Sequence, residues 1–114
     1  MSQQIVITRG DTYNFNLSII DETSSAGIYF LQDDDVLYFR IMRPNQPFEE
    51  AIIEKKYTVE DMDAEGIISL CISSEDTINL EPGRYYYSVK LSINNSTAKK
   101  EVTIIDKSKF IICD

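Results

Sequence analysis

The residues best suited to chemistry in this 114-residue chain are acidic side chains that fall in two short runs. The first run, Asp33-Asp34-Asp35, could supply paired carboxylates for general acid–base catalysis. Adjacent residues of an extended segment point to opposite faces, however, and no partner group is positioned beside them. We therefore interpret this run as a solvated loop.

The second run, Asp61-Met62-Asp63-Ala64-Glu65-Gly66, begins like a calcium-binding loop, with oxygen-bearing side chains at alternate positions and a glycine at the sixth. The twelfth position, where such a loop needs a bidentate glutamate, is Ile72, and the segment continues directly into a predicted strand. The favoured interpretation is a solvated acidic turn, and a weak surface cation site is the alternative.

The chain has no histidine, which excludes Ser-His-Asp and Cys-His catalysis, histidine-anchored zinc and imidazole pH switches. Arg9-Gly10-Asp11 spells the integrin-recognition tripeptide, but it lies where two predicted strands meet. We interpret it as a tight turn in which Asp11 bonds local backbone. The sequence thus predicts a non-enzymatic protein without catalytic, metal-binding or cofactor-binding residues.

The 19 acidic and 11 basic residues give a net charge near −8. Residues 1–57 carry 9 acidic and 5 basic side chains and residues 58–114 carry 10 and 6, so both halves lie near −4. Because no basic patch is evident to neutralise phosphates, we expect no nucleic-acid partner.

Hydropathy gives no sign of membrane insertion or export. No stretch approaches the roughly 18 consecutive apolar residues of a membrane span, and the opening MSQQIVITRG lacks the basic and apolar regions of a signal peptide. We expect no membrane partner and expression in a cytosol, where Cys71 and Cys113 are reduced thiols at strand positions.

The elements that must position these residues are strands. Isoleucine, valine, threonine, tyrosine and phenylalanine together make up 41 residues, against 4 alanines and 6 leucines. Branched and aromatic side chains favour pleated sheets, whereas alanine and leucine are the usual helix formers. At this length, with no linker or repeat, we predict one all-β domain over residues 1–114.

Alternation of apolar and polar residues predicts seven or eight strands with turns every 8–15 residues, the spacing of a sandwich or small barrel. In one of them, Leu37, Phe39 and Ile41 form the inner face. A short apolar piece at residues 28–31 accompanies the predicted strands 5–7, 12–20, 36–42, 51–57, 67–72, 85–93, 98–105 and 110–113.

The sharpest local signal is the segment LEPGRY at residues 80–85. Pro82 presets φ for a tight turn, Gly83 accepts a positive φ, and Tyr85 opens a strand. This pattern matches the tyrosine corner of Greek-key sandwiches, in which the tyrosine hydroxyl bonds to upstream backbone. It predicts a structural corner formed by Leu80, Pro82, Gly83 and Tyr85. Just upstream, residues 73–77 are predicted to form one capped helical turn.

Tyrosines also supply the candidate interaction surface, which consists of Tyr29, Tyr38, Tyr57 and Tyr86. Aromatic rings exposed on a β-sandwich suit the binding of carbohydrate or protein. A carbohydrate site would need two or three of these rings on one face beside carboxylates.

Several of these segments resemble a known family. Residues 9–12 (RGDT) lead into an alternating strand, and DVLYF at 35–39, SEDT at 74–77 and LEPGRYYY at 80–87 follow in order. The series resembles the N-terminal domain of the phage baseplate upper protein family, which opens with a similar R-G-D-T-x-x-F stretch and closes with an L-x-P-G-x-Y-x-Y strand. The resemblance extends from Ile5 to Ile112.

The resemblance implies an immunoglobulin-like Greek-key β-sandwich that connects a receptor-binding device to the tail tip. In that family a helical stalk and further modules follow the domain, whereas this sequence stops at Asp114. We therefore expect a structural or adaptor protein of a phage or prophage virion, in the tail or baseplate, made in the bacterial cytoplasm and then built into the virion. Its expected partners are other virion or tail proteins, or further copies of itself in a homo-oligomer.

One alternative function stays open at this point. The chain could instead be a carbohydrate- or protein-binding β-sandwich module that is not part of a virion.

The burial of the terminal segment is also open. The segment FIIC at residues 110–113 is apolar on both faces, so it is either buried by its own domain, which we favour, or completed by another subunit.

Overall fold

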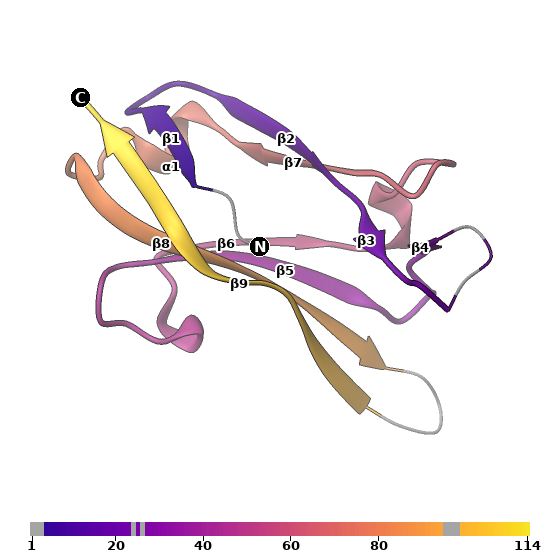
Figure 1. Cartoon of the computed structure of the whole chain (residues 1–114). Helices are drawn as coiled ribbons and strands as arrows, with labels where there is room; N and C mark the ends of the chain where they lie inside the picture. Colours follow the sequence, from indigo (N-terminus) through magenta and orange to yellow (C-terminus); the bar gives the residue numbers. More distant parts are fainter. Residues whose placement is uncertain (1–3, 24, 26, 95–98) are drawn as a thin grey trace.

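The computed structural model describes residues 4–23, 25, 27–94 and 99–114, and strands are its main secondary structure. Its main element is a five-stranded sheet in the order β1-β9-β8-β5-β6 (Figure 1). β1 runs parallel to β9, and the other neighbours are antiparallel. The strands of this sheet are β1 (Ile5–Thr8), β5 (Val36–Met42), β6 (Ile53–Tyr57), β8 (Gly83–Asn94) and β9 (Lys99–Cys113).

A smaller layer lies across one face of this sheet (Figure 1). It consists of two antiparallel pairs, β2 with β7 and β3 with β4. Three short helical turns join the strands. The bounds of these elements are Tyr13–Leu17 for β2, Ile19–Ile20 for β3, Ile28–Tyr29 for β4, Ile68–Ile72 for β7, Phe48–Glu50 for η1, Val59–Asp61 for η2 and Ser74–Thr77 for α1. The all-β prediction is confirmed.

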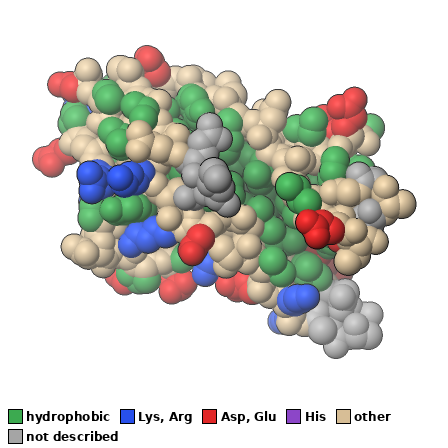
Figure 2. All heavy atoms as spheres, in the orientation of Figure 1, with side chains coloured by type: hydrophobic (Ala, Val, Ile, Leu, Met, Phe, Trp, Pro, Cys, Tyr) green, Lys and Arg blue, Asp and Glu red, His purple; other side chains and the backbone are tan. Residues whose placement is uncertain are grey.

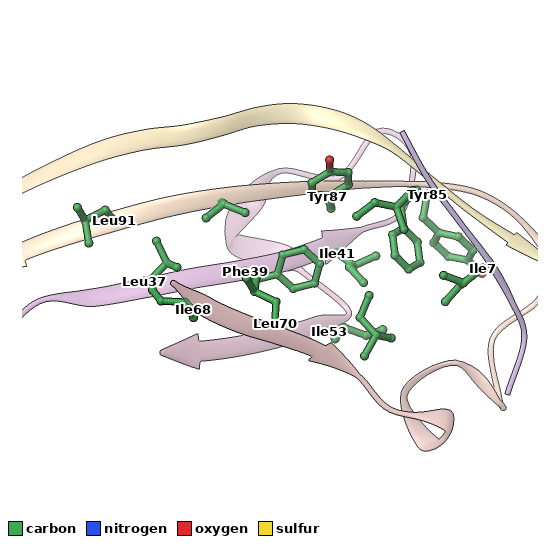
Figure 3. Close-up of a cluster of buried hydrophobic side chains, with 14 of the residues drawn as sticks. Ile7, Leu37, Phe39, Ile41, Ile53, Ile68, Leu70, Tyr85, Tyr87 and Leu91 are labelled. Carbon is green, nitrogen blue, oxygen red and sulfur yellow. The ribbon is translucent and has the colours of Figure 1, made fainter. Parts of the chain in front are cut away.

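The core fills the space between the layers and follows the alternation in the sequence. Leu37, Phe39 and Ile41 are fully buried on the inner face of β5, as predicted. They meet the buried residues of β7 and the inner tyrosines of β8 (Figure 3). A chain of ring contacts, with centroids 5.7–6.5 Å apart, crosses the core through Phe15, Phe39, Tyr87 and Phe110.

The strands differ from the prediction at two places. The predicted strand 12–20 is divided at Ser18 into β2 and β3. The predicted strands 98–105 and 110–113 form one continuous strand, β9. The polar residues between them also belong to the strand, and the pairing of β9 with β8 shifts register near Val89. Residue 98 lies outside the described residues.

The terminal segment is an interior part of the sheet, with β8 on one side and β1 on the other. Phe110 and Ile112 are fully buried, and Ile111 is half-buried on the outer face. The domain therefore buries this segment itself, as favoured from the sequence. The predicted helical turn is also present as α1, where Ser73 and Asp76 form a capping box.

Candidate functional site

The predicted corner and the smaller layer meet at one end of the molecule. The Tyr85 hydroxyl donates a hydrogen bond of 2.7 Å to the carbonyl oxygen of Glu81, which is the bond expected of a tyrosine corner. Gly83 has a φ of 148°. Leu80 is half-buried and packs against the core, so the corner fixes the path from α1 into β8.

The four candidate tyrosines do not form one surface, and none of them is fully exposed. Only Tyr38 and Tyr86 share a face, the outer face of the five-stranded sheet. Tyr86 is paired with Met42, four residues along β5 from Tyr38, which is roughly 13 Å at the rise of a strand. The other two rings, Tyr29 and Tyr57, make polar contacts that serve the fold.

Tyr57 lies on the inner side of the edge strand β6, where its hydroxyl accepts a hydrogen bond of 3.2 Å from the backbone N–H of Cys71. Burial raises the pKa of Tyr57. Two residues away, the Lys55 ammonium forms an ion pair of 2.8 Å with Asp76. Both contacts join the edge of the large sheet to the smaller layer, so Tyr57 acts within the fold and not as an exposed binding ring.

Tyr29 donates a hydrogen bond of 2.5 Å to the carboxylate of Asp35, which also accepts one of 2.9 Å from the backbone N–H of Gln32. Burial, together with the neighbouring carboxylate, raises the pKa of Tyr29. Asp35 is only 2% exposed. The expectation that all three aspartates at 33–35 are solvated is therefore wrong for Asp35, because it is the acceptor that closes the turn before β5.

In the acidic loop at 61–66, the carboxylates of Asp61 and Asp63 accept hydrogen bonds from the local backbone. Asp63 accepts hydrogen bonds from the backbone N–H groups of Glu65 and Ile67, and Asp61 completes a capping box with Thr58. Among the residues that the structure describes, no group of three His, Cys, Asp or Glu side chains is arranged to hold a metal ion.

The tripeptide at 9–11 forms a tight turn whose backbone closes from the N–H of Asp11 to the carbonyl of Thr8. The buried hydroxyl of Thr77 accepts a hydrogen bond from Gly10, and Arg9 forms an ion pair with Asp114. The turn is thus tied to α1 and to the end of β9. In the described part of the chain, no helix is long and apolar enough to cross a membrane.

A cluster of cations and rings covers the outer face of the five-stranded sheet. The Arg40 guanidinium lies 4.3 Å from the ring centre of Phe48 and 5.0 Å from that of Tyr38. Lys90 approaches Phe48 from β8 at 4.6 Å, and Lys56 approaches Tyr38 from β6 at 5.7 Å. Such contacts hold long side chains in place and keep their charges at the surface.

The same face continues onto β9. Lys107 lies over the ring of Tyr86 at 4.7 Å, and the exposed Arg84 and Lys109 occupy neighbouring outward positions. Two acidic strand residues accompany these cations: Glu54 pairs with Arg40 at 2.6 Å, and Glu101 lies 3.9 Å from Lys90. We call this surface the basic–aromatic face. It consists of Tyr38, Arg40, Phe48, Lys56, Arg84, Tyr86, Lys90, Lys107 and Lys109.

Charge is divided between the two layers. Residues 10–39 and 57–83, which contain β2, β3, β4 and β7, carry thirteen acidic residues and no basic one. The remaining segments carry all eleven basic residues and six acidic ones, a balance of +5, and they contain β1, β9, most of β6 and β8 and the last three residues of β5. The equal charge of the two halves of the sequence conceals this division, because each half contributes strands to both layers.

Sequence reasoning missed Arg40, Phe48 and Lys90 as surface residues. A sequence signal for part of this surface was available. Tyr38 and Arg40 are two residues apart on β5, and this spacing places a ring and a cation on the same face of a strand. The contact of both Arg40 and Lys90 with Phe48 depends on η1 folding back over the sheet, and no local pattern predicts that.

Comparison with known proteins does not assign the chain to a family. No protein-family model matches the chain, and a search of curated proteins finds no significant match. The functional argument therefore depends on the geometry described above.

Proposed function

We propose that this protein is a non-enzymatic structural or adaptor protein of a phage or prophage virion, located in the tail or baseplate and working through protein–protein contacts. The observation that carries the proposal is the basic–aromatic face. Tyrosine and arginine are enriched in the energetically dominant positions of protein interfaces, and here they are held on a rigid sheet. The sequence resemblance to the baseplate upper protein family supplies the virion setting.

We further propose that the fold is an immunoglobulin-like Greek-key sandwich. In this assignment β5, β8 and β9 correspond to the central strands of one sheet, and β2 and β7 to the paired strands of the other. The tyrosine corner between β7 and β8 supports the assignment, because immunoglobulin-like domains carry it at the equivalent connection.

The virion assignment is tested in the source bacterium. Particles released after prophage induction are purified and examined by mass spectrometry and by immunogold electron microscopy with an antibody against this chain. The proposal predicts the chain in the particles and label at the tail tip. Intact, infectious particles from a strain lacking the gene, together with no label on wild-type particles, would contradict it.

The role of the face is tested by exchanging its rings. Tyr38→Ala combined with Phe48→Ala is expected to abolish incorporation into particles while leaving the circular dichroism spectrum unchanged. Cys71→Ser, an exposed change on the outer side of β7, is the matched control and is expected to incorporate normally. Normal incorporation of the double variant would show that a different surface docks.

A second candidate is a binding module outside a virion, with carbohydrate as one ligand class. The observation in its favour is that Tyr38 lies on the same face as the carboxylate of Glu54. Its ring is already in contact with Arg40 and Lys56, which leaves less of it for stacking on a sugar. Binding on a glycan array that is lost in Tyr38→Ala would favour this candidate over the virion role.

A further inference from the structure

The end of the molecule opposite the tyrosine corner is acidic and partly apolar. Its segments are residues 19–35, of which 24 and 26 lie outside the described residues, and residues 59–66, and we call them together the acidic end. The backbone N–H of Leu31 contacts the sulfur of Met62 at 3.4 Å, so the two segments lie side by side. They carry nine acidic residues and no basic one, and Figure 2 shows acidic side chains at this end.

The acidic end also exposes hydrophobic side chains. Ile20 is 78% exposed and Phe30 39%, and these are two of the four large hydrophobic residues that the described part of the chain leaves exposed. Ile20 is paired with Ile28, and the side chains of Ile28 and Phe30 both lie beside Gly66, so all three share one side of the β3–β4 pair. An apolar stripe surrounded by acidic residues has the composition of an interface with a charged rim.

The basic–aromatic face is the complement of this end on the same molecule. Six of its members are cations, and its rings and the aliphatic stems of Arg40 and Lys56 offer apolar contact. We propose that the basic–aromatic face of one copy binds the acidic end of a second copy. The inference rests on the proposed assembly role and names the partner as the chain itself.

Charge disfavours the pairing of like surfaces. Two basic–aromatic faces would repel each other, and so would two acidic ends, because like charges across an interface disfavour association. A face-to-end contact that each pair of molecules makes only once is heterologous, so repeated association gives a closed ring or an open filament. The molecule measures 44 × 27 × 24 Å, which limits the buried area at its end to roughly 600 Å² per partner and predicts weak, concentration-dependent association.

The experiment measures the mass of the purified full chain by light scattering and sedimentation over a concentration series reaching several hundred micromolar. The face variant carries Lys56→Glu and Lys107→Glu. The end variant carries Ile20→Ser, Glu22→Gln and Glu65→Gln, all at exposed positions. Circular dichroism confirms that each variant is folded.

A matched control for the end variant comes from the opposite end of the molecule. Asp11→Asn, Glu75→Gln and Ile78→Ser also remove two negative charges and one exposed isoleucine, but next to the tight turn at 9–11. This control is expected to associate as the natural chain does. Loss of association in the control as well would attribute the effect to net charge and contradict the proposed site.

In 20 mM salt, the mass of the natural chain is expected to rise with concentration. In 500 mM salt, the association constant is expected to be at least tenfold lower, since salt screens the attraction between the two surfaces. Each variant alone is expected to be monomeric. An equimolar mixture is expected to form heterodimers and nothing larger, because one intact face and one intact end remain.

Besides loss of association in the control, three outcomes would overturn the inference: a natural chain that is monomeric throughout, a variant that still associates, or a mixture that stays monomeric. Because the measurement uses the isolated chain, a monomeric result would contradict self-association but would not contradict incorporation into particles. Conversely, association in solution without incorporation would contradict the virion role alone.

Discussion

The hydroxyl of Tyr29 and the carboxylate of Asp35 are joined by a hydrogen bond of 2.5 Å that connects β4 to the turn before β5. Asp35 is buried, and its carboxylate accepts hydrogen bonds from two donors, the tyrosine hydroxyl and the backbone N–H of Gln32. A buried carboxylate with two donors stabilises the conformation that brings them together. The pair therefore fixes the smaller layer to the start of the central strand.

We expect Asp35→Asn to destabilise the fold by about 2 kcal/mol, because both donors share one carboxylate oxygen and a neutral amide oxygen in its place accepts their hydrogen bonds more weakly. Tyr29→Phe is expected to cost about 1 kcal/mol, and the double variant less than the sum of the two. Urea unfolding followed by circular dichroism measures all three. Asp34→Asn, an exposed change beside them, is the control, and an Asp35→Asn cost as small as this control would contradict the assignment.

The tyrosine corner gives a second prediction. Tyr85→Phe removes only the hydroxyl that bonds to the carbonyl of Glu81, and we expect a loss of about 1 kcal/mol in the free energy of unfolding. Tyr86→Phe is the matched control on the opposite face, where the ring keeps its contact with Lys107. Equal stability of the two variants in urea would show that the corner bond adds nothing.

The sequence predicted the layers better than it predicted what joins them. Alternation located the inner face of β5 at Leu37, Phe39 and Ile41, because a period of two directly sets which side chains are buried. It could not distinguish Asp35 from its two neighbours, because only the fold brings Tyr29 within reach. A local pattern gives the direction of a side chain but not its partner.

The candidate site shows the same limit. Tyr38 and Tyr86 lie on the outer face of the five-stranded sheet, whereas Tyr57 points inward because it is paired with the buried Leu37 of β5. The division of charge between layers was hidden for a related reason. Strands of both layers alternate along the chain, so the sequence averages charges that the fold separates.

The ion pair between Lys55 and Asp76 predicts a dependence of stability on pH. Partial burial raises the pKa of Asp76, but hydrogen bonds from Lys55 and Ser73 outweigh it and lower the pKa overall. A carboxyl with a lowered pKa in the folded state stabilises the fold fully above its unfolded value of about 3.9. That stabilisation is lost as the pH falls through the folded-state pKa.

Asp76→Asn tests this dependence. We expect the variant to be less stable than the natural chain by about 2 kcal/mol at pH 7, and the difference to shrink steadily below pH 4. Urea unfolding from pH 7 to pH 3 measures it, with Glu75→Gln in the same helical turn as the control. A difference that is constant over this range would mean that the carboxylate charge has no part in the stability.

Two glycines with similar backbone angles provide the sharpest steric test. Gly27 and Gly66 have φ values of 73° and 79°, so alanine is strained to a similar degree at both. A Cβ at Gly66 would lie 2.8 Å from a side-chain carbon of Ile28 and 3.1 Å from the ring of Phe30, whereas a Cβ at Gly27 would meet nothing within 4 Å. We expect Gly66→Ala to cost about 2 kcal/mol more than Gly27→Ala, because it forces apart the acidic loop and the β3–β4 pair. Thermal and urea unfolding of both variants measure the difference, and equal costs would show that the two segments are not in close contact.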